Sequence, residues 1–340
     1  MKIMPKRLRI YIAVAMGWGA LFFPPSLPAA EITPFYTQNQ SPVIQIFGLP
    51  SIGEPSLVPA RKADLRFIVD LTNHFIEDQN QRESIILDGQ RTRISLDARY
   101  GISKNFEFGL AIPYIIEGGG FTDGFIDWYH NTFGFPAGGR DQAPKNRLLY
   151  QYQKDRQVLL KVNKSSNGIG DIQLMGGFQL YQSAVKPSRA ISLRASLKLP
   201  TGDSQQLHGS GSTDLSLWMT AGEDFRPGIG HMTLFGAGGV MGMTDGDVLK
   251  DQQRNWVGFG VLGLGWSPAR WIAFKIQANG HTSFYKDSGL EELNAGSVQL
   301  TIGGTLSFSK NINLDLGVTE DPLNHASPDV VFHLALRGSF

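Results

Sequence analysis

Residues 330–340 read VVFHLALRGSF, and from His333 onward polar and apolar side chains alternate. Leu334 and Leu336 fall on one face of an extended chain, whereas His333 and Arg337 fall on the other. A period of two residues is the pattern of a β-strand with one apolar and one polar face. The run has the length that a tilted strand needs to cross a bilayer, about 9–11 residues. The stretch therefore predicts a membrane-crossing strand.

The same alternation recurs along the chain. Residues 64–71 read DLRFIVDL and residues 93–100 read RISLDARY, with an apolar residue at every second position. A closed barrel in lipid explains such runs, since its outer face is apolar and its interior is polar. A soluble β-sandwich shares the alternation, so the links between the runs must separate the two folds. Similar runs occur at 106–116, 191–199, 272–279 and 298–308.

The links between these runs alternate between short and long. This rhythm is typical of the periplasmic turns and extracellular loops of outer-membrane barrels. The chain is therefore predicted to be all-β, a transmembrane antiparallel up-and-down β-barrel. Short links are expected at 101–103, 186–188, 226–228, 267–270 and 309–311. Long polar links are expected at 74–90, 201–211, 244–255, 286–294 and 320–328.

The number of strands depends on residues 118–167. Taken as one long external loop, this stretch leaves about 12 strands, an even number as expected for such barrels. The alternative is 14 strands, with 147–153 and 156–162 forming a hairpin in the barrel wall. We favour the smaller number because those two runs are short. The predicted strands cover 63–75, 90–101, 104–117, 168–182, 188–201, 211–224, 229–243, 255–267, 270–285, 295–309, 311–320 and 329–340.

Two segments precede the barrel domain, which is assigned to residues 61–340. Four basic residues followed by an uncharged apolar run predict a secretory signal peptide over residues 1–30. Residues 31–60 contain five prolines and are too long to be only a leader. We expect this segment to stay periplasmic or to enter the lumen as a partial plug. If it plugs, its deletion raises the conductance of the protein in planar bilayers.

The composition narrows the classes of partner. The chain has 31 Lys+Arg and 30 Asp+Glu, and four of the basic residues fall in the predicted signal peptide. The remaining chain is slightly acidic, which argues against a nucleic-acid partner. It has no cysteine, so an exported fold must hold together without disulfides. No cofactor or metal is expected, because the histidines show no zinc spacing and residues 244–251 lack the calcium-loop pattern.

Charged residues fall on the inward face when the alternation is extended to each strand. They are candidates to line a pore and to orient a polar solute. The alternative is that opposite charges pair across a narrow lumen only to neutralise one another, in which case no strong ion selectivity is expected. The candidates for pore lining are Arg66, Asp97, Arg99, Asp171, Arg194, Lys198, Lys275, Asp315 and Arg337.

The long loop contains an apolar stretch with helical rather than strand spacing. Phe125, Trp128, Tyr129 and Phe133 share one face of a helix, which glycines at 118–120 and a proline at 136 bracket. The sequence therefore predicts a short helix in this loop, with those four residues as candidates for a lid or constriction at the barrel mouth. The alternative is an external helix that lies on neighbouring loops or on lipid headgroups.

An enzyme is the least favoured class. Membrane-embedded hydrolases need a serine, a histidine and an orienting group that converge in space. His208, Ser210 and Ser212 lie together in one predicted loop, with Asp203 and Asp214 nearby. Neighbours in sequence are weak evidence for such a site, so no catalytic residue is assigned.

Several motifs resemble an uncharacterised family of Gram-negative outer-membrane proteins, a domain of unknown function. They are 39–42 (NQSP), 47–50 (FGLP), 138–141 (GGRD) and 168–171 (GIGD). The resemblance covers the chain after the signal peptide. It implies an outer-membrane β-barrel and brings no known activity.

The expected partners follow from this location. They are outer-membrane lipid, a small solute, and the barrel assembly machinery, which reads a last amphipathic strand ending in a residue such as Phe340. The favoured function is a passive channel or transporter for a small polar or amphipathic solute. A structural, adhesion or assembly barrel without transport is the first alternative, and a membrane-embedded hydrolase is the second.

Overall fold

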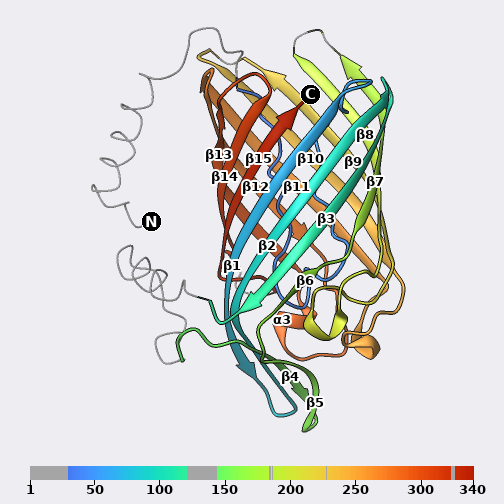
Figure 1. Cartoon of the computed structure of the whole chain (residues 1–340), viewed down its shortest axis with the longest axis vertical. Coiled ribbons are helices and arrows are strands. Elements are labelled where there is room, and N and C mark those ends of the chain that lie inside the picture. The colour runs from blue at the N-terminus through green and yellow to red at the C-terminus, as the bar shows by residue number, and fades with distance from the viewer. Residues whose placement is uncertain (1–29, 121–143, 184, 186, 227, 323–325) are drawn as a thin grey trace, which may run out of the picture.

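The computed structural model describes residues 30–120, 144–183, 185, 187–226, 228–322 and 326–340. Antiparallel strands follow one another around a tilted barrel, and β1 pairs with β15 from Asp64↔Ser339 to Asn73↔Val330 to close it (Figure 1). The wall strands are β1 Ala63–Gln79, β2 Glu83–Ser103, β3 Phe106–Gly118, β7 Gln173–Ser183, β8 Ser188–Lys198, β9 Asp214–Phe225, β10 His231–Met243, β11 Trp256–Ala269, β12 Ile272–His281, β13 Ser297–Ser307, β14 Ile312–Glu320 and β15 Val330–Ser339. In the described residues the wall thus has the twelve strands that the alternation predicts.

The alternative of fourteen strands is wrong for a specific reason. The hairpin does form, as β4 Leu149–Lys154 and β5 Gln157–Val162. However, β4 pairs with residues 83–88 of β2, beyond the part of β2 that pairs with β3. The hairpin therefore extends the sheet outside the barrel wall (Figure 1). The short strand β6 Ser166–Ile169 pairs with the end of β3 and continues into β7, so both count as one wall strand.

The long polar link expected at 74–90 is also wrong. β1 and β2 continue their pairing through this stretch, from Asn73↔Gln90 to Gln79↔Ser84. Ile85 and Leu87 explain the extension, because both side chains are fully buried in a cluster at this end of the barrel. Most of the polar residues that suggested a loop lie at residues 77–84, at the tip of the hairpin and beside it.

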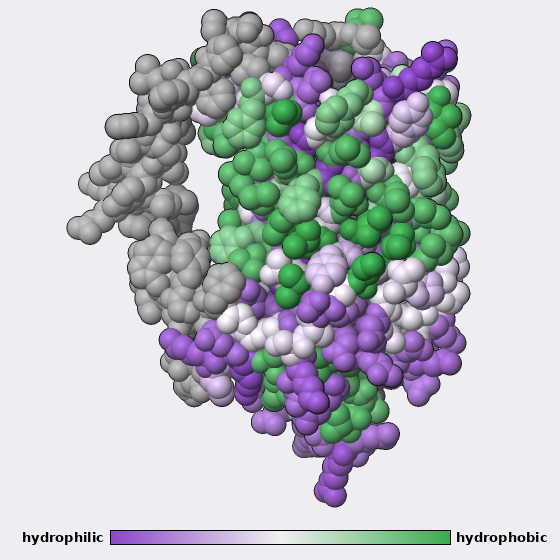
Figure 2. Space-filling view, viewed as in Figure 1, coloured by the Kyte–Doolittle hydropathy of each residue, from purple (hydrophilic) through white to green (hydrophobic). Residues whose placement is uncertain are grey.

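The two faces of the wall follow the alternation of the sequence. Leu65 and Phe67 in β1 are 41% and 47% exposed, whereas Asp64 and Arg66 are 2% and 3% exposed. Apolar side chains form a band across the middle of the visible face, and hydrophilic residues gather above and below it (Figure 2). No helix among the described residues is long and apolar enough to cross a membrane.

The two ends of the barrel differ in their links. Short turns such as 104–105 and 308–311 lie at the end that carries the C-terminus, at the top of Figure 1. The longer loops lie at the opposite end, with the short helix α3 Glu291–Asn294. In outer-membrane barrels the short turns face the periplasm, and we name the ends accordingly.

Three predictions concern the ends of the chain and the long loop. The backbone of Phe340 pairs with Ala63, at N···O distances of 2.9 and 3.1 Å, and its side chain is 65% exposed. Its role as an assembly signal stays a prediction. The lid candidates Phe125, Trp128, Tyr129 and Phe133 lie outside the described residues, and so do residues 1–29 of the signal peptide predicted over residues 1–30.

A charge on the lipid face of the wall tests this arrangement. Ile302 lies midway along β13 and is 57% exposed. Ile302→Arg is expected to lower the free energy of unfolding in liposomes by about 2–4 kcal/mol, because it places a guanidinium at the bilayer midplane. Val298→Arg, on the same face near the strand end, is expected to cost only about 0–1 kcal/mol. Equal costs in denaturant titrations would contradict the assigned depth.

Candidate functional site in the barrel lumen

Residues 30–60, which we call the plug, fill the lumen. The segment enters at the periplasmic end, where Ile32 packs on Gly265, and reaches the extracellular end at residues 41–47. It then returns to the periplasmic end, where Val58 N donates to Glu107 Oε2 at 2.7 Å. The sequence explains why the plug needs the wall. Its prolines prevent regular structure. Backbone groups of Phe35, Gly48 and Ile52, among others, therefore bond to side chains of the wall.

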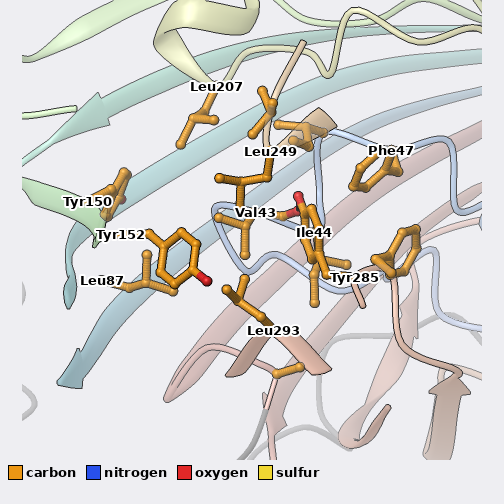
Figure 3. Packing of buried hydrophobic residues seen from close by; sticks show 14 of the residues in the cluster. Val43, Ile44, Phe47, Leu87, Tyr150, Tyr152, Leu207, Leu249, Tyr285 and Leu293 are labelled. Atoms are coloured by element: carbon orange, nitrogen blue, oxygen red, sulfur yellow. Dashed lines mark hydrogen bonds between the residues drawn. The ribbon is translucent and has the colours of Figure 1, made fainter. Parts of the chain in front are cut away.

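Hydrophobic residues close the extracellular end of the lumen. Val43, Ile44 and Phe47 of the plug pack against side chains from the surrounding loops, including Leu249 and Leu293 (Figure 3). The ring of Phe47 stacks on that of Phe284 at 4.9 Å, and Tyr285 Oη donates to Val43 O at 2.7 Å. We call this cluster the cap. Burial of each large apolar side chain contributes about 1.5–3 kcal/mol, so the cap holds the plug strongly.

Below the cap, Lys198 of β8 joins the plug to two carboxylates of the wall. Its Nζ lies 2.8 Å from Asp171 Oδ2 and 3.1 Å from Asp214 Oδ2, and it donates to Ile46 O at 3.1 Å. Asp214 Oδ2 also accepts from Gly48 N at 2.7 Å. The two motifs at 168–171 and 47–50 therefore meet at one buried cation.

A second buried cation lies on β12. Lys275 Nζ donates to Asp315 Oδ1 at 2.9 Å and to Thr33 O of the plug at 3.0 Å. The same ammonium lies 4.0 Å from the centre of the Phe35 ring, a cation–π contact. Both lysines thus pair with wall carboxylates and also bind the plug backbone.

The periplasmic half of the lumen holds a cluster of arginines. Arg66 and Arg337 occupy directly opposed positions on β1 and β15, where two like charges repel. Asp64 lies between them, 2.6 Å from Arg66 and 2.5 Å from Arg337. Glu54 of the plug forms ion pairs with both, and its Oε2 lies 3.2 Å from Arg337 Nη2. Arg337 also pairs with Glu31 at 3.0 Å.

Two further arginines face the same part of the plug. Arg99 and Arg194 share the carboxylate of Glu107, and Arg194 Nη2 donates to Glu54 O at 2.6 Å. Gly53 has a φ of +71°, and a Cβ at this position would lie 2.5 Å from Arg99 Nη1 and 3.0 Å from Arg194 Cζ. Only glycine allows this conformation and this close approach without strain. Residues 53 and 54 therefore sit directly on the guanidinium groups.

The structure places all nine candidates for pore lining on the inner face of the wall. Eight are buried and Arg337 is partly buried. All nine carry a hydrogen bond, ion pair or ring contact to the plug or to a residue that binds it. Most of them pair with an opposite charge, which was the alternative interpretation. Their role in lining an open pore stays a prediction, because the plug occupies the lumen.

The sequence analysis missed the plug residues of the site, above all Glu54 and Tyr36. The Tyr36 ring lies 3.9 Å below the guanidinium carbon of Arg66 and 5.2 Å from that of Arg99. One signal was available in the sequence. Glu31 and Glu54 are the two charged residues of the otherwise neutral segment 31–60. Two carboxylates in a neutral segment beside a charged lumen indicate specific partners.

The loop proposed for a hydrolase does not assemble one from the expected residues. Ser210 Oγ bonds to Lys198 and to Ser212, at 2.7 Å for the latter. His208 Nε2 instead lies 3.0 Å from Ser166 Oγ, and burial and the charge of Arg91 lower the pKa of His208. Among the described residues no carboxylate bonds to His208 to orient it. The described residues also contain no group of three or more His, Asp or Glu able to hold a metal ion.

A cavity of about 570 Å³ opens on the periplasmic side of the plug. This volume is in the range of pockets for small molecules, about 300–1,000 Å³. Glu31, Ile32 and Glu54 of the plug line it on one side, and the ends of β8, β9 and β10 line it on the other. The cavity leads to the carboxylate of Glu54, whose side chain is 15% exposed.

A closed antiparallel barrel with an apolar outer belt and a polar lumen defines an outer-membrane β-barrel. The chain belongs to the family described as "Protein of unknown function (DUF3187)", which matches residues 10–340. No curated protein matches it in sequence.

One solved structure shares the fold at low sequence identity, and two others are more distantly similar. An outer-membrane channel from Pseudomonas putida F1 is 11% identical, with a TM-score of 0.53 over 85% of this chain and 98% of that one. The toluene transporter TbuX from Ralstonia pickettii is 12% identical, with a TM-score of 0.34 over 92% and 97%. The porin NanC is 7% identical, with a TM-score of 0.45 over 81% and 98%.

Removal of the Lys198 ammonium tests whether this residue holds the lumen together. Lys198→Met leaves Asp171 and Asp214 buried without their cation. We expect the free energy of unfolding to fall by about 3–5 kcal/mol, the usual cost of breaking a buried ion pair from one side. Denaturant unfolding in liposomes measures the change. Lys161→Met, on the exposed β4–β5 hairpin, is the matched control and is expected to change stability by less than about 0.5 kcal/mol.

Proposed function

We propose that the protein is an outer-membrane channel for a small polar or amphipathic solute, closed in this structure by its own plug. The observation that carries the proposal is the course of residues 30–60, which run through the lumen and back. Both limbs of the plug are buried against a wall of charged and polar side chains. Movement of the plug opens a polar path along the barrel axis.

The contacts between plug and wall favour a plug that can leave the lumen, rather than one that fills it permanently. Small barrels that are permanently filled use side chains of the wall itself. Here the wall presents Arg, Lys, Asp, Gln, Ser and Thr, groups that water solvates well once the plug moves. Below the cap, hydrogen bonds and ion pairs hold the plug, and these exchange for bonds to water at small net cost. The polar lumen is therefore compatible with both a closed and an open state.

The proposal also covers how the protein is exported and in which membrane it resides. We infer that residues 1–30 direct export across the inner membrane of a Gram-negative bacterium and are then removed. The barrel assembly machinery would then insert the chain through its last strand, which ends at Phe340. The channel from Pseudomonas putida F1, which has the same fold over most of its length, supports a transport function over an enzymatic one.

A disulfide between plug and wall tests the proposal. A Cβ at position 265 would lie 3.3 Å from Ile32 Cβ, close to the separation of about 3.5–4.5 Å in disulfides. The double variant Ile32→Cys/Gly265→Cys ties down the free end of the plug, while β1 holds the other end. We expect single-channel openings in planar bilayers when the disulfide is reduced, and their loss when it is oxidised.

The controls come from the chain itself, which has no native cysteine. Each single-cysteine variant is expected to conduct equally in both redox conditions. Conductance that persists in the oxidised double variant would contradict a plug that must move. A folded and inserted wild-type barrel that stays silent under all conditions would favour the structural or adhesion function instead.

A further inference from the structure

We propose that Arg66, Arg99, Arg194 and Arg337 form a carboxylate-binding site in the lumen, that Glu54 of the plug occupies it in the closed state, and that the permeating solute is a small organic anion. This inference rests on the proposed channel function and specifies its substrate class. It starts from the charges around Glu54.

The wall supplies more positive than negative charge at this level. Four guanidinium groups converge from β1, β2, β8 and β15, and three carboxylates of the wall lie beside them. Asp64 pairs with Arg66 and Arg337, Glu107 pairs with Arg99 and Arg194, and Asp97 lies 3.5 Å from Arg99. The fourth negative charge comes from the plug, as Glu54. The wall alone therefore keeps one uncompensated positive charge in a buried place.

The hydrogen bonds in the cluster leave donors for an anion. In the part of the chain that the structure describes, Arg194 Nε has no hydrogen-bond acceptor, and Arg99 Nε has only the Asp97 carboxylate at 3.5 Å, beyond ordinary hydrogen-bond length. Both side chains are buried, at 4% and 3% exposure. Buried donors normally find a partner. Arginine also binds carboxylates through paired N–H groups in a planar fork, and such charge-assisted bonds are strong.

The plug brings two carboxylates to this site: Glu31 contacts Arg337 alone, from the exposed side, and Glu54 lies between two of the arginines. Glu54 binds Arg66 and Arg337 through its two oxygens, and its backbone carbonyl accepts from Arg194. The periplasmic cavity is lined by Glu54 and by none of the four arginines, so a small anion that enters it gains the guanidinium groups when Glu54 leaves them. Two of the acids at the rim of the cavity are already compensated, since Glu223 pairs with Arg189 at 3.0 Å and Glu31 with Arg337, and Asp224 accepts hydrogen bonds from Ser188 and Thr233. Glu54 thus stands where the carboxylate of a solute would bind.

Acetate binding to the full mature chain in detergent tests the site, with acetamide as the neutral probe. Glu54→Ala removes the carboxylate and leaves space for acetate beside the guanidinium groups. We expect acetate, followed by NMR of its labelled carboxyl carbon, to bind this variant at least about tenfold more tightly than wild type. In the wild-type protein, acetate must compete with the Glu54 carboxylate, which is part of the same chain and therefore has a high effective concentration at the site. Acetamide is expected to bind neither.

Two variants separate the carboxylate from other effects of the substitution. Glu54→Gln removes the charge but keeps the volume, so acetate is expected to gain less than in Glu54→Ala. Glu223→Ala removes an exposed carboxylate of the same cavity and is expected to leave acetate affinity at the wild-type level. Circular dichroism checks that each barrel is folded. If Glu54→Ala does not fold, Glu54→Asp, which keeps the carboxylate on a shorter arm, is expected to show intermediate affinity.

Conductance of the same proteins distinguishes the two proposals. In a gradient of potassium acetate, the reversal potential of open Glu54→Ala channels is expected to indicate preferred passage of acetate, and Arg194→Gln is expected to weaken that preference. Acetate that binds Glu54→Ala no more tightly than Glu223→Ala overturns the carboxylate site. Open channels that prefer potassium overturn the anionic substrate class. If acetate binds tightly but no single-channel openings are seen, the carboxylate site is supported and the channel function is contradicted.

Discussion

The need to compensate charge inside the lumen is the constraint on which the rest of the structure depends. The outer face of the wall must be apolar, and strict alternation then leaves every second residue of each strand facing inward. In this chain many of those residues are charged, and a narrow lumen brings them close together. Asp171, Asp214 and Lys198 neutralise one another at one level, and Lys275 and Asp315 do so at another. The plug completes the compensation where the wall alone does not.

Two kinds of contact hold the plug in the lumen, and they contribute different properties. The cap contributes apolar burial around Phe47, which is stabilising but not selective. The arginine cluster contributes little net stability, because desolvation of a buried ion pair offsets much of its attraction. The arginine cluster instead determines which chemical group can bind there, because the two opposed arginines and the glycine at position 53 leave room for one carboxylate between them. Affinity and selectivity are therefore located at opposite ends of the lumen.

The sequence predicts the wall well because the wall depends on local rules. Alternation in stretches such as 93–100 gives the strands, their inward faces and their number. The same rules fail where the partner is distant in sequence. The polar stretch 74–90 is a strand because Ile85 and Leu87 are buried in the cap, and no local pattern shows the cap. The position of Glu54 beside Arg337 joins residues 283 positions apart. The expectation of weak ion selectivity rests on pairing of opposite charges across the lumen, a pattern that carries no information on which charges the plug supplies, and it stays a prediction.

The course of the plug also determines the order in which the molecule can be built. Residues 30 and 63 both lie at the periplasmic rim, so the plug is a loop inserted from one side and never threads the barrel. The wall can close along β1 and β15 while the lumen is still filled with water. The topology therefore allows the plug to enter in a separate step, after the wall has closed.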